Sequence, residues 1–179
     1  PEWIQYIKNS MSEIAPDYTM KRMLDDYINR FYNKLATRSA HLRENGFAEA
    51  KSIAAWKEEV AEHWDNFQVE SFTCSQDLAI DGPVVGKEYK FNLVIDRHEL
   101  QGMLGVEMVV TKENPDNHQL ELLATEQFKL MKEEGSKLFF ELKTTPSEAG
   151  LHKMGFRVYP VNKELPHRMD FAFVRWIQL

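Results

Sequence analysis

The sequence predicts an α+β protein, with about three N-terminal helices followed by an antiparallel, immunoglobulin-like β-sandwich. Apolar residues recur at helical spacing until about residue 65 and at alternate positions thereafter. Turn-forming residues then divide the second part into about seven short stretches. These observations predict a helical segment over residues 1–66 and a β-sandwich over residues 67–179.

The helical part divides at two breaking residues. Residues 3–14 place Trp3, Ile7 and Met11 on one face, and Pro16 ends this helix. A second helix is predicted from an N-cap at Thr19 to about residue 42, before Gly46. A third covers about residues 47–64. The second helix has a wide apolar stripe, made of Met23, Leu24, Tyr27, Ile28, Phe31 and Leu35.

Alternating apolar and polar residues predict the strands. They fall near residues 69–73, 89–95, 106–110, 120–130, 138–142, 154–158 and 171–175. Turn signals separate them, at 81–83, 102, 114–117, 134–135 and 146–150. The half-polar faces favour antiparallel pairing. The helix-to-strand join at residues 65–68 is short, so we expect a fixed relation between the two parts.

Composition excludes several classes of protein. The 179 residues hold 28 acidic and 22 basic side chains, a net charge of −6, which argues against a nucleic-acid binder. A single cysteine, Cys74, rules out an internal disulfide and favours a cytoplasmic protein. No apolar run approaches the roughly 20 residues that span a bilayer, so no membrane partner is expected.

Three groups of residues carry a family resemblance. The first runs from Trp3 through Lys8, Ser10 and Pro16 to Arg22-Met23-Leu24, Tyr27 and Tyr32. The second comprises Ala50-Lys51, Ala54-Ala55-Trp56-Lys57 and Trp64. The third comprises Gly150, residues 155–160 (GFRVYP) and Val174-Arg175-Trp176. In this order they resemble the C-terminal region of the bacterial α-glucan (glycogen/maltodextrin) phosphorylases.

The resemblance implies a piece of a larger enzyme. The chain starts without methionine, with a helical pattern already present at Trp3, so we expect a C-terminal fragment. The parent would perform phosphorolysis of α-1,4-glucans to glucose 1-phosphate with pyridoxal phosphate. No glycine-rich phosphate loop occurs in the sequence, so no catalytic or cofactor-binding residue is assigned. We therefore expect a non-catalytic scaffold, interface or accessory part.

Metal binding and stand-alone hydrolysis have little support. The six histidines form no H-x-x-x-H pair, and Cys74 has no partner at metal-ligand spacing, so no metal site is assigned. Adjacent carboxylates such as Glu58-Glu59 do not provide the separation of about 5–9.5 Å that glycoside hydrolysis needs. A stand-alone enzyme is therefore the least supported interpretation.

The apolar stripe of the second helix suggests an interdomain contact. In the family such a helix packs on the catalytic region, which implies contact residues Trp3, Arg22, Met23, Tyr27 and Phe31. The partner would be the remainder of the parent chain, with a homodimer or the sandwich as alternatives. For Arg22, a local ion pair with Asp25 or Asp26 is the simpler interpretation.

An alternative function is an autonomous carbohydrate-binding module, with α-glucan as partner. Such modules stack exposed aromatic rings on sugar faces, and Trp176 and Tyr159 are the assigned candidates, with Tyr89 and Trp64 as further ones. Aromatic residues more often fill a core. Exposed rings would favour sugar binding, and buried rings would favour a scaffold.

Overall fold

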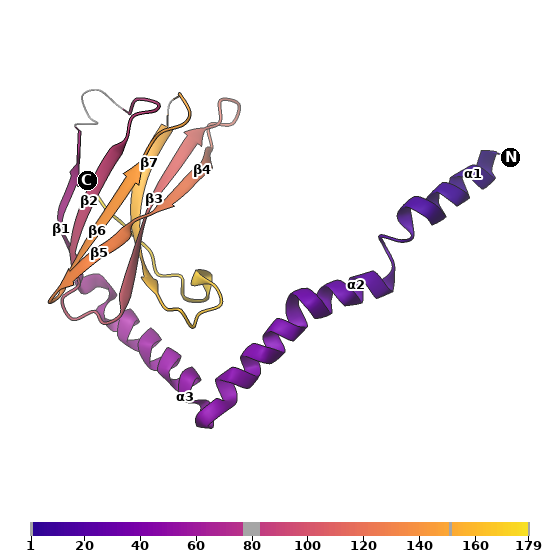
Figure 1. Ribbon diagram of the computed structural model, residues 1–179, viewed down its shortest axis with the longest axis horizontal. Coiled ribbons are helices and arrows are strands. Elements are labelled where there is room, and N and C mark those ends of the chain that lie inside the picture. Colours follow the sequence, from indigo (N-terminus) through magenta and orange to yellow (C-terminus); the bar gives the residue numbers. More distant parts are fainter. Residues whose placement is uncertain (1, 77–82, 151, 179) are drawn as a thin grey trace. The chain divides into compact units, whose positions relative to one another are not determined.

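The computed structural model describes residues 2–76, 83–150 and 152–178, and belongs to the α+β class (Figure 1). The chain forms two compact units, Pro1–Ala54 and Ala55–Leu179. Each is described by itself below. No helix among the described residues is long and apolar enough to cross a membrane.

The first unit consists of helical segments joined by π-helical turns. Helix α1 (Glu2–Asn9) continues into a π-helical turn (Ser10–Ile14), and the chain leaves the helix before Pro16. Helix α2 (Met20–Tyr27) continues into a second π-helical turn (Ile28–Tyr32). The side chain of Thr19 accepts a hydrogen bond from the backbone N–H of Arg22 at 3.2 Å, which confirms the predicted N-cap.

Helix α3 (Asn33–His63) is interrupted where Gly46 was expected to end a helix. The backbone is non-helical from Glu44 to Phe47, and φ is positive at Asn45, Gly46 and Phe47. The helical region is thus not the three continuous helices that were expected, because π-helical turns and this interruption divide it differently. Glycine and asparagine tolerate positive φ, whereas Phe47 adopts it against its steric preference.

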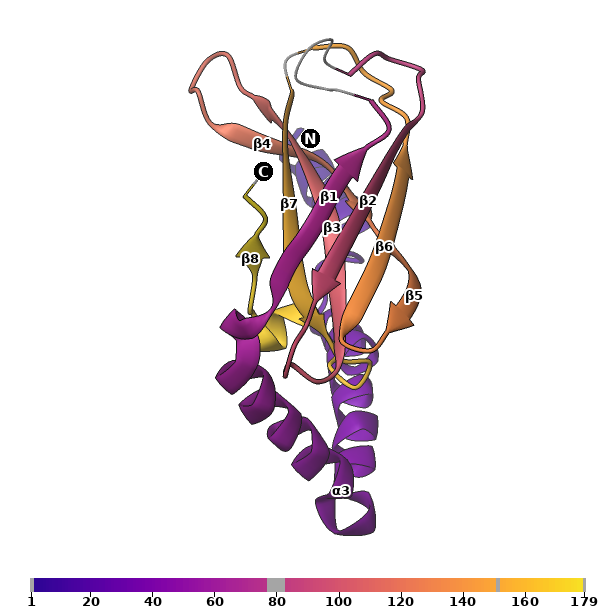
Figure 2. The same ribbon diagram turned by 90° about the vertical axis from the view of Figure 1, so that its left-hand side faces the viewer.

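The second unit contains two antiparallel four-stranded sheets that face each other (Figure 2). One has the order β1 (Gln68–Cys74), β2 (Tyr89–Asp96), β6 (Lys137–Thr144), β5 (Lys129–Glu134). The other has the order β4 (Leu120–Gln127), β3 (Met103–Glu113), β7 (His152–Val161), β8 (Arg175–Trp176). Strands β2 and β6 pair over eight residues without a register shift.

Alternate residues of both sheets form one core between them. Inward-facing side chains of β2 and β7 include Phe91, Phe156 and Val158, which are all buried. The rings of Phe72 and Phe156 lie 4.7 Å apart between centroids and join the two sheets. Aromatic pairs of this kind add about 0.5–1.5 kcal/mol beyond the area they bury. The expected alternation is therefore the pattern that fills the core.

The end of α3 joins this core. Val60 and Trp64 are buried, and the ring of Trp64 contacts those of Phe67 and Phe173 at 5.3 and 5.6 Å. The compact units therefore divide within α3, after Ala54. The domain boundary between residues 66 and 67 remains a prediction from sequence.

Two strand predictions were wrong in detail. The single strand expected over 120–130 is two strands, β4 and β5, which lie in different sheets. The chain passes from one sheet to the other at Phe128, which is buried. Because Phe128 is apolar, the alternation of apolar residues in the sequence shows no break between the two strands. The strand expected over 171–175 is a 3-10 turn (Arg168–Phe171) followed by the two-residue strand β8.

Most predicted turns are present among the described residues. Gly102 and Gly135 have the positive φ that favours glycine in turns. At 114–117, the Asn114 side chain accepts from the backbone N–H of Asp116 at 2.9 Å. Of the turn expected at 81–83, Asp81 and Gly82 lie outside the described residues.

Candidate functional site

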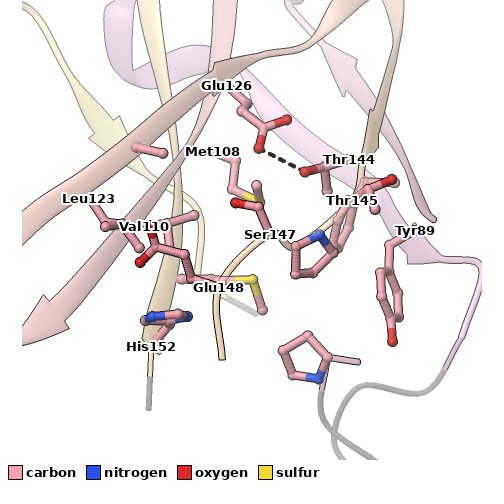
Figure 3. A pocket seen from close by; sticks show the side chains of 15 residues that line it. Tyr89, Met108, Val110, Leu123, Glu126, Thr144, Thr145, Ser147, Glu148 and His152 are labelled. Carbon is pink, nitrogen blue, oxygen red and sulfur yellow. Dashed lines mark hydrogen bonds between the residues drawn. The ribbon is translucent and has the colours of Figure 1, made fainter. Parts of the chain in front are cut away.

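A pocket of about 230 Å³ lies between the two sheets (Figure 3). Strands β2, β3, β4 and β7 line it, together with residues 144–148 at and after the end of β6. The buried side chains of Phe91 and Met108 are among its apolar lining residues. The pocket thus extends from the core toward the ends of the strands.

Two polar side chains occupy inward-facing positions of this pocket. Glu126 of β4 pairs in register with the buried Met108 of β3, and its Oε1 accepts a hydrogen bond from Thr144 Oγ1 of β6 at 2.7 Å. This bond crosses between the two sheets. On β7, His152 occupies the same alternating face as Met154 and Phe156. The pattern of an apolar core is therefore broken by a carboxyl and an imidazole.

His152 has an unsatisfied ring nitrogen. Its Nε2 is buried and has no hydrogen-bond partner among the described residues. Figure 3 shows His152 on the same side of the pocket as Glu148. A buried polar atom without a partner costs about 1–3 kcal/mol. The pocket is thus lined by two carboxylates and an imidazole: Glu126, which is hydrogen-bonded across the two sheets, Glu148 on the loop after β6, and His152. The rest of the lining is mainly apolar and includes Phe91 and Met108.

The two aromatic residues expected to bind sugar lie in different environments. Trp176 on β8 is 51% exposed, and its ring lies against Gly155, with the guanidinium of Arg157 5.6 Å from the ring centroid. Tyr159 on β7 is buried, because its ring lies against Gly105. Of the two, Trp176 presents ring surface to solvent. The further candidates Tyr89 and Trp64 are both buried.

Tyr159 lies beside a buried ion-pair cluster. Glu107 is 1% exposed; it accepts a hydrogen bond from Arg157 and another, at 2.8 Å, from Arg168. The guanidinium of Arg168 lies 5.1 Å from the ring centroid of Tyr159. Burial, and then the charge of Glu107, raise the pKa of the Tyr159 hydroxyl. The bond to Glu107 raises the pKa of Arg168, so this arginine stays charged.

The expected interdomain residues lie exposed on the helices of the first unit. Trp3, Met23, Tyr27 and Phe31 are 73, 37, 45 and 52% exposed. Tyr27 and Phe31 contact each other at 6.1 Å between ring centroids. Arg22 donates to Asp26 at 2.7 Å, which is the local ion pair that was the simpler interpretation. A pair this exposed contributes less than about 1 kcal/mol.

Comparison with known proteins identifies the family. The family profile described as the glycogen phosphorylase C-terminal domain matches residues 64–178, most of the chain. The chain belongs to this family. The match begins at Trp64, the residue whose ring joins the end of α3 to the sandwich core.

Two curated phosphorylases are similar to the chain. The maltodextrin phosphorylase of Thermococcus litoralis is 26% identical over 196 aligned residues, which cover 97% of this chain and 20% of that protein. The glycogen phosphorylase of Aquifex aeolicus is 44% identical over 34 residues, which cover 19% of this chain and 5% of that protein. The chain thus spans about a fifth of the length of the first relative. No solved structure matches significantly.

Sequence reasoning did not identify the pocket of this phosphorylase C-terminal domain. Glu126 and His152 belong to no motif, and the residues that surround them come from distant segments. One signal was present in the sequence. His152, Met154, Phe156 and Val158 alternate, so that the histidine falls on the face that carries the apolar residues.

Proposed function

We propose that the chain is the non-catalytic C-terminal part of a cytoplasmic α-glucan phosphorylase. The parent would convert α-1,4-glucan and phosphate to glucose 1-phosphate. The alignment of nearly the whole chain with a fifth of a maltodextrin phosphorylase supports this proposal. In the parent, this part would act as scaffold and interface.

The cofactor is assigned to the rest of the parent. Pyridoxal phosphate is held by enzymes as a Schiff base on a lysine, in a site that binds its phosphate. Among the described residues no lysine is buried, and Lys90 and Lys137 form surface ion pairs with Glu141 and Glu70. The described lysines therefore do not fit such a site, and we derive no reaction step in this chain.

The observation that carries the interface role is the exposed apolar surface of the first unit. Helices α1 and α2 and their π-helical turns contain no buried residue. Fully burying a large apolar side chain contributes about 1.5–3 kcal/mol. Burial of exposed side chains such as Trp3, Met23, Tyr27 and Phe31 against another surface is therefore favourable. The remainder of the phosphorylase chain is the partner we propose.

The test combines an activity assay with a binding assay. Purified chain, supplied with pyridoxal phosphate, maltoheptaose and phosphate, should release no glucose 1-phosphate, whereas a complete maltodextrin phosphorylase should. The parent chain truncated before this sequence should bind the chain when the two are mixed. Tyr27→Asp with Phe31→Asp should weaken that binding at least tenfold, and the control Lys21→Asp, also on α2, should not. Glucose 1-phosphate release by the chain alone would refute the non-catalytic assignment.

We further propose that the sandwich has immunoglobulin-like topology. If β1 to β8 are lettered A, B, C, C′, D, E, F and G, the two sheets have the orders A-B-E-D and C′-C-F-G. The constant-type fold places A, B, E and D in one sheet and C, F and G in the other, and variable-type folds add C′. An experimental structure that placed β5 in the sheet of β3 would contradict the assignment.

A second candidate function is carbohydrate binding by the sandwich. The half-exposed indole of Trp176 is the observation that favours it. Calorimetric titration with maltoheptaose should then give saturable binding that Trp176→Ala abolishes. Trp3→Ala is the matched control, because Trp3 is an exposed tryptophan of the other unit. Absence of heat at millimolar sugar would leave the scaffold role alone.

A further inference from the structure

We propose that the pocket between the sheets binds a small organic cation, an ammonium group carried on an apolar body. The proposal concerns the second unit alone and does not depend on the identity of the parent. It commits to the pocket lined by Phe91, Met108, Glu126, His152 and Met154.

The first step of the argument is the position of Glu126. Glu126 is partly buried at an inward-facing position of β4, and a carboxylate that loses part of its hydration favours a compensating partner. Thr144 supplies one hydrogen bond, to Oε1, and no described residue bonds to Oε2. Glu126 also has no salt-bridge partner among the described residues, whereas Glu113 and Glu141 on the outer surfaces are paired with lysines. Glu126 is therefore held in place by one oxygen and has the other available for a cation.

The second step is the imidazole of His152. Its Nε2 is buried and has no partner among the residues that the structure describes, and His152 is one of the residues that line this pocket. A neutral ring nitrogen without a proton accepts a hydrogen bond, and an ammonium has three to donate. A cation that is hydrogen-bonded to Glu126 or Glu148 and to Nε2 of His152 would give this nitrogen a partner. It would thereby remove the free-energy cost of a buried, unpaired polar atom.

The third step is the apolar remainder of the pocket. Phe91 and Met108 form buried walls, and Leu123 and Met154 flank them from β4 and β7. The volume of about 230 Å³ accepts a body of the size of one aromatic ring with a short chain. Both charged side chains of the lining, Glu126 and Glu148, are acidic, so the pocket disfavours anions.

Three probes of one shape test the proposal: benzylamine, benzyl alcohol and benzoate. Each is titrated into the intact 179-residue chain with methionine methyl groups and histidine rings labelled for NMR. We expect saturable shifts of Met108, Met154 and His152 with benzylamine. Benzyl alcohol should bind more weakly, and benzoate at least about tenfold more weakly, because it lacks donors and carries the wrong charge.

The matched variants are Glu126→Gln and Glu121→Gln, both on β4. Glu121 lies outside the pocket and is exposed. Glu126→Gln should weaken benzylamine about tenfold and leave benzyl alcohol nearly unchanged, whereas Glu121→Gln should change neither. If the Glu126→Gln variant does not fold, the order of affinities of the three probes for the unaltered chain still tests the proposal. Equal binding of benzoate and benzylamine, or no saturable shift with any probe, would overturn the proposal.

Discussion

At the scale of single residues, Glu107 is the one buried charged side chain that the described part of the chain contains. Two arginines from different segments converge on it. Arg157 belongs to β7, and Arg168 belongs to the 3-10 turn that precedes β8. The carboxylate therefore ties the C-terminal turn to the middle of a sheet, across 61 residues of sequence.

Removal of this carboxylate should be costly. Glu107→Ala leaves two arginines without their partner, and Arg157 is mostly buried. Breaking a fully buried pair costs about 3–5 kcal/mol, and partial exposure of the arginines should reduce this to about 2–3 kcal/mol. Urea unfolding measures the difference. Glu134→Ala, which removes an exposed pair with Lys132, should cost less than about 1 kcal/mol. Equal losses would show that the cluster contributes no more than a surface pair.

Asp96 should make stability depend on pH. A hydrogen bond from the backbone N–H of His98, followed by one from Ser136, lowers the pKa of Asp96 below its usual 3.8. A depressed folded-state pKa contributes stability above the unfolded pKa, and that contribution is lost as pH falls through the folded value. The unfolding free energy of Asp96→Asn should therefore fall less steeply than that of the unaltered chain between about pH 5 and pH 2. Parallel curves would contradict this assignment.

At the scale of elements, an aromatic ring packs directly against the backbone of two strand glycines, Gly105 and Gly155. A Cβ at Gly105 of β3 would lie 2.5 Å from the ring of Tyr159, and one at Gly155 of β7 would lie 2.8 Å from that of Trp176. Neither glycine has positive φ, so crowding is the main cost of substitution. Tyr159 is buried beside Glu107 and Arg168, whereas Trp176 is half exposed on a two-residue strand. The two neighbours therefore differ in how far they can move.

Substitution by alanine should separate the two sites. Gly105→Ala overpacks a position whose neighbour cannot move, and should lower the unfolding free energy by about 1–3 kcal/mol. Gly155→Ala should cost less, because Trp176 can turn toward solvent. Thermal and urea unfolding of the two variants give the comparison. A larger loss at Gly155 would mean that β8 is held more firmly than its two paired residues indicate.

The elements could be predicted from sequence where one pattern governs them. Alternation located β2, β6 and β7, because their inward residues are uniformly apolar or nearly so. It missed the division between β4 and β5, because Phe128 is apolar and buried at the point where the chain changes sheet. Alternation also did not reveal the pocket, because Glu126 and His152 line the same pocket only through the pairing of strands that are distant in sequence.

At the scale of the whole molecule, the two units differ in what stabilises them. Every residue of the core cluster lies in Ala55–Leu179, and α1 and α2 contribute none. Most of the stability of a helix in a protein comes from the packing of its apolar face, and this face is exposed on α1 and α2. Amide hydrogen exchange should therefore be fast over residues 2–43 of the chain alone and slow in β2, β3, β6 and β7. Protection of Tyr27 and Phe31 comparable to that of the strands would point to self-association.

The burial of Val60 and Trp64 has a mechanical consequence. The last turns of α3 belong to the same compact unit as the sandwich. Val60 of α3 is buried, and Trp64, in the 3-10 turn directly after α3, contacts Phe67 and Phe173. We therefore expect the end of α3 to move together with the sandwich, and the join between helix and strand not to act as a hinge. The backbone is non-helical at residues 44–47, so we expect the helical region to bend most easily there. In a longer polypeptide, that short break is where bending would be absorbed while the sandwich keeps its form.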